Sequence, residues 1–305
     1  MKLLYTVIII CLCLFTVRAQ TLTDGLMMQK DNFCTGFLYT HDQWTQYWEG
    51  SLKRDNGNIG KVTTQSLVWA GNYGITNRLN VIAMVPYVRT KASQGTLAGM
   101  EGLQDLTVGV KYNFFTHLRE GVSKFKLFAV AQLSTPLNDY TPDFLPLSIG
   151  MSSTNVAGRI TTFYKHDKQG WFANASFGYT VRSNVQLDRP SYFTNDRIYF
   201  TNEVDMPNVF DAFISAGYLK NGLQAEVNFT GQNTLGGDDI RRQDMPFVSN
   251  RMNFSKVGVL VMYYLPALPE LALRASGSYT VYGRNVGEST TLLAGVLYTF
   301  KFNNQ

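Results

Sequence analysis

Charged side chains recur inside segments in which apolar and polar residues otherwise alternate. Glu226 stands between two apolar residues, and so does Arg274. Because alternate side chains of a strand point to opposite faces, these charges fall on the polar face of their segments. Charges that face one lumen can line a path for water and solutes, or they can pair across the lumen and close it. The candidates for lining a lumen are Lys111, Arg159, Arg182, Asp211, Glu226, Lys256 and Arg274.

Residue types that could perform catalysis are few and scattered. The chain has three histidines, and none has a serine or aspartate partner that the spacing identifies. Two of the three cysteines lie in an apolar run at the N-terminus, which leaves Cys34 alone in the rest of the chain. One cysteine and scattered histidines provide no metal-ligand spacing. We therefore expect a protein that is not an enzyme, with no cofactor and no metal site.

The alternation that positions these charges is clearest at 223–234. Its odd positions are apolar or glycine from Leu223 to Gly231, and its even positions are polar or charged. The segments 171–182 and 271–282 show nearly the same separation. This period of two is typical of a β-strand with one apolar and one polar face.

Applied to the whole chain, the pattern predicts an all-β fold. Several expected strands match the roughly nine to eleven residues that a tilted strand needs to cross hydrocarbon. Beyond the N-terminal run, no stretch approaches the roughly eighteen apolar residues of a membrane-spanning helix. We therefore predict a transmembrane antiparallel up-and-down β-barrel of about twelve strands, of the outer-membrane type. The expected strands are 43–53, 60–73, 79–90, 104–115, 123–134, 153–165, 171–183, 208–219, 223–235, 253–265, 270–283 and 289–302.

The connections between these segments alternate between two classes. Short turns, such as 220–222 and 266–269, alternate with mostly longer links, such as 184–207 and 236–252. Outer-membrane barrels have short periplasmic turns and longer external loops. Every second strand also ends, before its short turn, with an aromatic residue on the apolar face. We expect these residues to form a periplasmic aromatic girdle: Tyr73, Phe114, Tyr164, Tyr218, Tyr263 and Phe300.

The N-terminus resembles a secretory signal. Lys2 is followed by an apolar run, and Ala19 provides a small residue for cleavage, so the mature chain is expected to begin near Gln20. The formal net charge is +5, and loss of Lys2 and Arg18 with the signal leaves +3. This small excess argues against a nucleic-acid partner. The expected organisation is a signal peptide at 1–19, an N-terminal periplasmic segment or luminal plug at 20–42, and a barrel at 43–303.

Three runs carry a resemblance to a known family: YGITNRLNV at 73–81, VPYV at 85–88 and GLQDLTVGVKY at 102–112. They resemble the family often labelled phenol-degradation MetA-pathway transporters, clearly over residues 60–115 and elsewhere by architecture alone. The resemblance implies an outer-membrane barrel that takes up small hydrophobic compounds. It assigns no substrate residue, because the shared motifs are turns and strand starts. The last strand also resembles a barrel-assembly signal, although residues 303–305 follow the aromatic Phe302, whereas the usual signal ends on its last aromatic residue.

We therefore expect a passive conduit or facilitated carrier for small, apolar or aromatic solutes in the outer membrane. Its expected partners are outer-membrane lipid, the solute and the barrel-assembly machinery. A structural or adhesive barrel that binds ligands through its external loops is the first alternative. The loop 184–207, which is rich in tyrosine and phenylalanine, favours that alternative. An outer-membrane hydrolase is the second alternative.

Overall fold

The computed structural model describes residues 21–241 and 245–302. The expected signal peptide and its cleavage near Gln20 lie outside the described residues. Within the described residues the structure is almost entirely β, with one three-residue 3-10 turn, η1, at Pro142–Phe144. No helix in this part of the chain is long and apolar enough to cross a membrane.

One large sheet forms the wall of a barrel. In the part of the chain that the structure describes, this sheet contains 13 strands, all of them long except the three-residue strand β6 (Glu101–Leu103). The long strands are β1 (Asn32–Trp44), β4 (Val62–Thr76), β5 (Leu79–Ala92), β7 (Asp105–Arg119), β8 (Ser123–Pro136), β9 (Asn155–His166), β10 (Trp171–Arg182), β15 (Val209–Lys220), β16 (Leu223–Thr234), β17 (Asn253–Leu265), β18 (Leu268–Arg284) and β19 (Thr290–Lys301).

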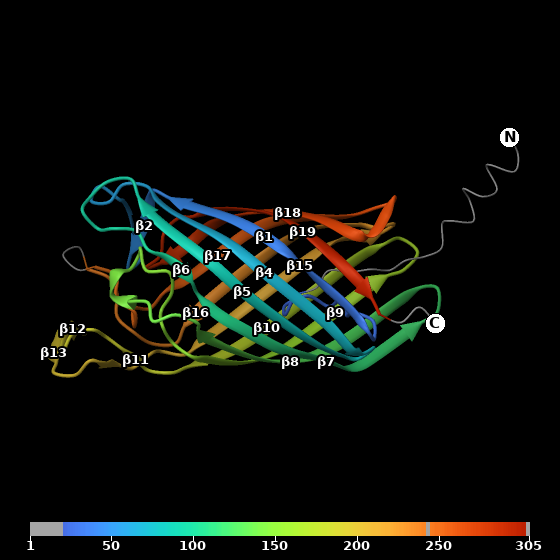
Figure 1. Cartoon of the computed structure of the whole chain (residues 1–305), viewed down its shortest axis with the longest axis horizontal. Helices are drawn as coiled ribbons and strands as arrows, with labels where there is room; N and C mark the ends of the chain where they lie inside the picture. Colours follow the sequence, from blue (N-terminus) through green and yellow to red (C-terminus); the bar gives the residue numbers. More distant parts are fainter. Residues whose placement is uncertain (1–20, 242–244, 303–305) are drawn as a thin grey trace, which may run out of the picture.

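The sheet closes on itself through β1. Each long strand pairs antiparallel with the next along the chain, and β1 pairs with both β4 and β19. Phe37, for example, lies opposite Trp69 on one side and Val296 on the other. A closed barrel leaves no free edge, so every strand satisfies its backbone hydrogen bonds within the sheet, as hydrocarbon requires. The predicted barrel of about twelve antiparallel strands is confirmed (Figure 1).

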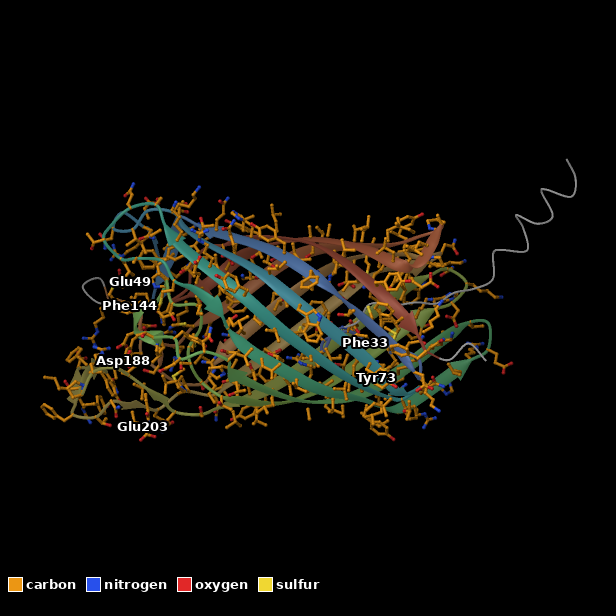
Figure 2. All side chains as sticks on the ribbon, in the orientation of Figure 1. Phe33, Glu49, Tyr73, Phe144, Asp188 and Glu203 are labelled. Carbon is orange, nitrogen blue, oxygen red and sulfur yellow. The ribbon has the colours of Figure 1, made fainter. Side chains whose placement is uncertain are left out.

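The two ends of the barrel differ, as the sequence predicts. At one end, which we call the short-turn end, two residues join β4 to β5, β15 to β16 and β17 to β18. Asn221 and Gly222 both have positive φ angles, 54° and 76°, as a tight two-residue hairpin of the type I′ class needs. The other end, the long-loop end, carries the paired strands β2 (Gln46–Glu49) and β3 (Leu52–Asp55), β11 (Val185–Gln186) and β14 (Glu203–Val204), and β12 (Tyr192–Thr194) and β13 (Arg197–Tyr199). Figure 2 shows Glu49, Phe144, Asp188 and Glu203 at this end, with Phe33 and Tyr73 toward the other.

Apolar side chains cover the outside of the wall. On β16, Val227 is 62% exposed, whereas its neighbour Glu226 on the inner face is 9% exposed. The six aromatic residues expected to form a girdle lie near the short-turn end on the outer face, five of them exposed and Tyr164 half-buried. Phe114 lies at a β-bulge between β7 and β8, so Phe114 and Phe115 are both exposed. The outer surface is therefore suited to lipid.

The first strand differs from the prediction. It is Asn32–Trp44, whereas the sequence analysis placed it at 43–53 and put residues up to 42 outside the barrel. The segment after it forms the small β2–β3 hairpin at the long-loop end. The alternation in β1 is obscured because Cys34 and Leu38 on its inner face are apolar and pack in the interior. The barrel therefore begins eleven residues earlier than predicted.

Candidate functional site

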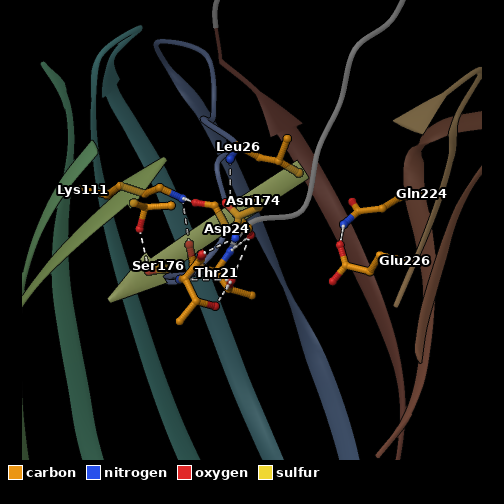
Figure 3. Close-up of polar contacts among 10 residues, drawn as sticks. Thr21, Asp24, Leu26, Lys111, Asn174, Ser176, Gln224 and Glu226 are labelled. Atoms are coloured by element: carbon orange, nitrogen blue, oxygen red, sulfur yellow. Dashed lines mark hydrogen bonds and ion pairs between the residues drawn. The ribbon is translucent and has the colours of Figure 1, made fainter. Parts of the chain in front are cut away.

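The N-terminal segment, defined here as residues 21–30, lies against the inner face of the barrel (Figure 3). Leu22, Leu26 and Met28 are each at most 5% exposed. Each enters a different apolar cluster on the wall, so the segment contacts the barrel on several sides. These clusters are apolar patches on an inner face that elsewhere carries polar side chains such as Asn80, Thr161 and Ser176.

The three clusters come from strands on different parts of the circumference. Leu22 packs with side chains of β5 and β8, Ile82 and Val130. Leu26 packs with side chains of β8, β9, β10 and β15, namely Phe128, Phe163, Phe172 and Leu219. Met28 packs with side chains of β1, β17, β18 and β19, namely Cys34, Leu260, Met262, Tyr264, Ala272 and Leu297. Burial of these apolar groups favours docking of the segment, at about 1.5–3 kcal/mol for each fully buried large side chain.

Two glycines make room for this contact. A Cβ atom at Gly109 on β7 would lie 2.3 Å from Leu22 Cδ2. A Cβ atom at Gly25 would lie 2.1 Å from Phe163 Cβ. Both distances are far below van der Waals contact, so any side chain at either position requires the segment or the wall to move. The close approach therefore depends on glycine.

Polar contacts fix the same segment in place. Lys111 on β7 is fully buried, and its Nζ lies 2.8 Å from Asp24 Oδ1 and donates to the Thr21 carbonyl at 3.0 Å. The same Asp24 oxygen accepts the Leu26 amide at 2.9 Å. Asn174 on β10 donates to the Thr23 carbonyl at 3.1 Å. These contacts supply hydrogen-bond partners for a chain segment that lies away from bulk water.

A second ion pair lies on the inner face of β9, β10 and β15. Arg159 pairs with Asp211, and Gly178 lies between them in register with both. A Cβ atom at Gly178 would lie 2.6 Å from Asp211 Oδ1 and 2.7 Å from Arg159 Nη2. The glycine on the middle strand therefore lets the two charges meet across it. Arg159 also donates to Ser176 Oγ at 3.2 Å.

Glu226 and Arg274 lie on another part of the wall. Glu226 accepts a hydrogen bond of 3.1 Å from Gln224 Nε2. Arg274 interacts electrostatically with Asp24 and Glu226, but within the described residues it forms no ion pair or hydrogen bond with them. Glu226 and Arg274 line a cavity of about 190 Å³ between the N-terminal segment and β15–β18, together with Asp24.

The two remaining candidates lie nearer the long-loop end. Lys256 donates to Ser289 Oγ at 3.0 Å and lies 5.4 Å from the centroid of the Phe254 ring. Arg182 ends β10 and lines a cavity of about 960 Å³ among the external loops. The seven predicted residues are thus distributed along the interior in separate groups and do not form one site.

The loops above the barrel pack through aromatic rings and charge pairs. Tyr192 stacks on Tyr199 at 5.1 Å and on Phe247 at 5.3 Å between ring centroids. Asp239 accepts two hydrogen bonds of 2.7 Å from Arg284 and one of 2.7 Å from Asn285. The Arg284 hydrogen bonds hold the pKa of Asp239 below its ordinary value. These contacts join the loop after β16 to the end of β18.

Sequence reasoning missed Asp24, the residue of the N-terminal segment that pairs with Lys111. Its neighbours Leu26, Met27 and Met28 carried a signal, because they are apolar in an otherwise polar stretch. Nothing in the spacing connects Asp24 to Lys111, which follows 87 residues later. Among residues 21–241 and 245–302, no group of three or more His, Cys, Asp or Glu side chains is placed to hold a metal ion.

The sequence matches the family described as "Putative MetA-pathway of phenol degradation" over residues 57–295. A search of curated proteins found no significant match.

One solved structure shares the fold of this chain, and two others are more remotely similar. An outer membrane channel from Pseudomonas putida F1 has a TM-score of 0.70 at 15% identity, with 93% of this chain and 100% of that chain covered. The β domain of the Bordetella autotransporter BrkA has a TM-score of 0.49 at 13% identity, with 89% and 100% covered. The CymD monoaromatic hydrocarbon channel has a TM-score of 0.39 at 10% identity, with 91% and 90% covered. The first likeness extends over the whole barrel, and the other two are distant.

Proposed function

Since the chain belongs to the family described as putative MetA-pathway of phenol degradation, we propose that it is an outer-membrane channel for small, apolar or aromatic solutes. The similar structure from Pseudomonas putida F1 is described as an outer membrane channel, which supports this class of function. In this proposal the protein is not an enzyme. The barrel provides a path for the solute across the membrane and performs no chemical reaction on it.

The observation that carries the proposal is the narrowed but polar interior. The N-terminal segment is docked on three apolar clusters, yet a cavity of about 190 Å³ remains beside it, lined by charged and polar side chains together with a few apolar ones. A barrel with a purely structural role needs no such space. We propose that residues 21–30 act as a luminal plug that restricts passage to small molecules.

The proposed path enters at the long-loop end. A cavity of about 530 Å³ lies among the external loops, and Phe144, Phe193 and Phe247 contribute aromatic surface to it. Aromatic and apolar linings are common in sites that bind small organic molecules. In this orientation the long loops face outward and the short turns face the periplasm. Glu226 and Arg274 then line the passage beside the N-terminal segment, and the buried Lys111 holds that segment in place.

Export and assembly complete the proposal. A precursor with residues 1–19 as a cleaved signal would reach the periplasm, where the barrel-assembly machinery recognises the aromatic last strand. Phe300 and Phe302, at the end of that strand, are exposed on the outer face. Lipid then covers the apolar outer surface.

Uptake by intact cells tests the proposal. Cells that produce the protein are expected to take up toluene at dilute supply faster than cells carrying an empty vector, and the uptake of a large sugar is expected not to change. Intact cells are needed because small apolar solutes cross plain phospholipid vesicles without a channel. Equal toluene uptake in both strains would contradict the proposal.

A receptor or adhesive function is the second candidate. Phe200 is 88% exposed and Ile198 is 61% exposed on the loop between β10 and β15. Exposed apolar side chains on an external loop can mark an interaction surface. Tight binding of a ligand to these loops without any solute uptake would favour this alternative.

A further inference from the structure

The cavity beside the N-terminal segment has the size of a single small organic molecule. Its volume of about 190 Å³ compares with the roughly 150 Å³ of a protein cavity that holds one benzene ring. Its apolar wall comes from the inward-facing side chains of Phe213 on β15 and of Leu260 and Met262 on β17. These side chains suit a compact carbon skeleton.

One charged side chain in this cavity is incompletely satisfied. Arg274 Nε is buried and has no hydrogen-bond partner in the described part of the chain. Arginine carries five N–H donors and no acceptor, and a donor held away from water without a partner is costly. Arg274 Nε therefore needs an oxygen atom that can accept its hydrogen bond.

The register places an acceptor close to this donor. Leu260 on β17 lies opposite Glu226 on β16, and Met262 lies opposite both Gln224 on β16 and Arg274 on β18. Glu226 and Arg274 thus approach the cavity from strands on either side of β17. A group that accepts from Arg274 and donates to the Glu226 carboxylate fits between them, and a hydroxyl group does both.

The charges around the cavity disfavour an anion. Glu226 and Asp24 both line it, so a bound carboxylate would meet two like charges. Lys111 already pairs with Asp24, and Arg274 is the cation left to balance Glu226. A neutral ligand keeps this balance.

We propose that this cavity is a subsite for a compact neutral molecule with an apolar body and one hydroxyl group. The inference deepens the channel function proposed above and rests on it for its role, because it places the subsite on the path of the solute. Arg274 and Glu226 orient the hydroxyl, and the apolar wall holds the body.

Binding to purified protein in lipid nanodiscs tests this subsite separately from transport. Calorimetric titration with benzyl alcohol and with toluene compares two ligands that differ by one hydroxyl group. We expect benzyl alcohol to bind about tenfold more tightly, a difference of about 1.4 kcal/mol. Benzoate is expected to bind more weakly than benzyl alcohol. Equal binding of benzyl alcohol and toluene, or tighter binding of benzoate, would overturn the proposal.

A substitution tests whether Arg274 causes the tighter binding of benzyl alcohol. Arg274→Met is expected to lower benzyl alcohol binding to the level of toluene and to leave toluene binding unchanged. The matched control is Lys165→Met, which removes another buried interior cation that does not line this cavity. Equal losses in both variants would overturn the assignment to Arg274. If either variant fails to fold, the comparison of ligands on the parent protein still decides the question.

The two proposals can fail independently. Selective binding without toluene uptake by cells would contradict the channel and retain the subsite. Uptake without selective binding would retain the channel and overturn the subsite.

Discussion

Lys111 on β7 and Asp24 in the N-terminal segment form an ion pair of 2.8 Å in the interior of the barrel, where the Lys111 side chain has no exposed surface. The pair joins a strand of the wall to the N-terminal segment. Apolar contacts alone are not directional, so they could hold this segment in more than one position. Because buried charges need a partner, the pair also penalises release of the segment. It therefore specifies one position for the proposed plug.

Replacement of Lys111 by methionine tests this relationship. The variant Lys111→Met leaves Asp24 without its cation, which costs about 3–5 kcal/mol for a buried pair. We expect protease to cleave the N-terminal segment faster in this variant, as measured by mass spectrometry of the digest. The double variant Asp24→Leu/Lys111→Met removes both charges and is expected to recover much of the protection. Equal cleavage of the parent and Lys111→Met would show that the pair does not hold the segment.

The close approach at Gly109 gives a second prediction. In Gly109→Ala the new Cβ would lie 2.3 Å from Leu22 Cδ2, so the segment must shift while the wall remains. We expect faster hydrogen exchange at residues 21–28, with little change in the strands. Gly158→Ala on β9 is the matched control, because a Cβ atom there meets nothing within 4 Å. The same exchange in both variants would mean that Leu22 is not seated against β7.

Adjacent residues on β16 test which face meets lipid. Val227 is 62% exposed on the outside, so Val227→Lys would place a charge in hydrocarbon and cost about 2–4 kcal/mol near mid-membrane. We expect Val227→Lys to fold less well into lipid vesicles, as measured by the change in gel migration on heating. Glu226→Gln changes the inner face and is expected to fold like the parent. The reverse order of folding yields would mean that the two faces are inverted.

Acid is expected to loosen the loop after β16. Arg284, by donating hydrogen bonds, keeps the pKa of Asp239 below its ordinary value of 3.8. A carboxyl with a lowered pKa stabilises the folded loop above the ordinary value, and this contribution is lost as the pH falls through the lower folded value. Hydrogen-exchange protection near Asp239, measured relative to the intrinsic exchange rate at each pH, should therefore fall below about pH 4. Asp239→Asn should show reduced protection already at neutral pH, and unchanged protection of the parent across this pH range would contradict this role of the pair.

The barrel could be predicted from the sequence because lipid and lumen impose opposite polarity on alternate residues. On β16 this alternation holds from Leu223 to Gln232, and its predicted bounds differ from the observed ones by one residue. Strand β1 was misplaced because its inner face contacts apolar groups of the N-terminal segment, so Cys34 and Leu38 interrupt the alternation. The search for alternating apolar and polar residues assumes that the lumen is polar. It fails for a strand whose inner face contacts another part of the chain.

The interior charges were predicted as residues, but their pairing was not. Arg159 and Asp211 are 52 residues apart and meet through the register of three strands across Gly178. The spacing of charges along the chain contains no information about register, since register depends on the turns and on pairing in three dimensions. Glu226 and Arg274 have opposite charges and both lie on the inner face of the barrel, but the cavity separates them. Charge type could be deduced from the sequence, whereas partners could not.

Ion conductance in planar lipid bilayers tests the central claim, that the barrel encloses a passage narrowed by its N-terminal segment. The parent protein is expected to give small conductance steps, and a variant lacking residues 21–28 is expected to give steps several times larger. Both proteins must first show the heat-dependent gel migration of a folded barrel. Absence of conductance from both folded proteins would contradict the account, because the lumen would then be closed even without the segment.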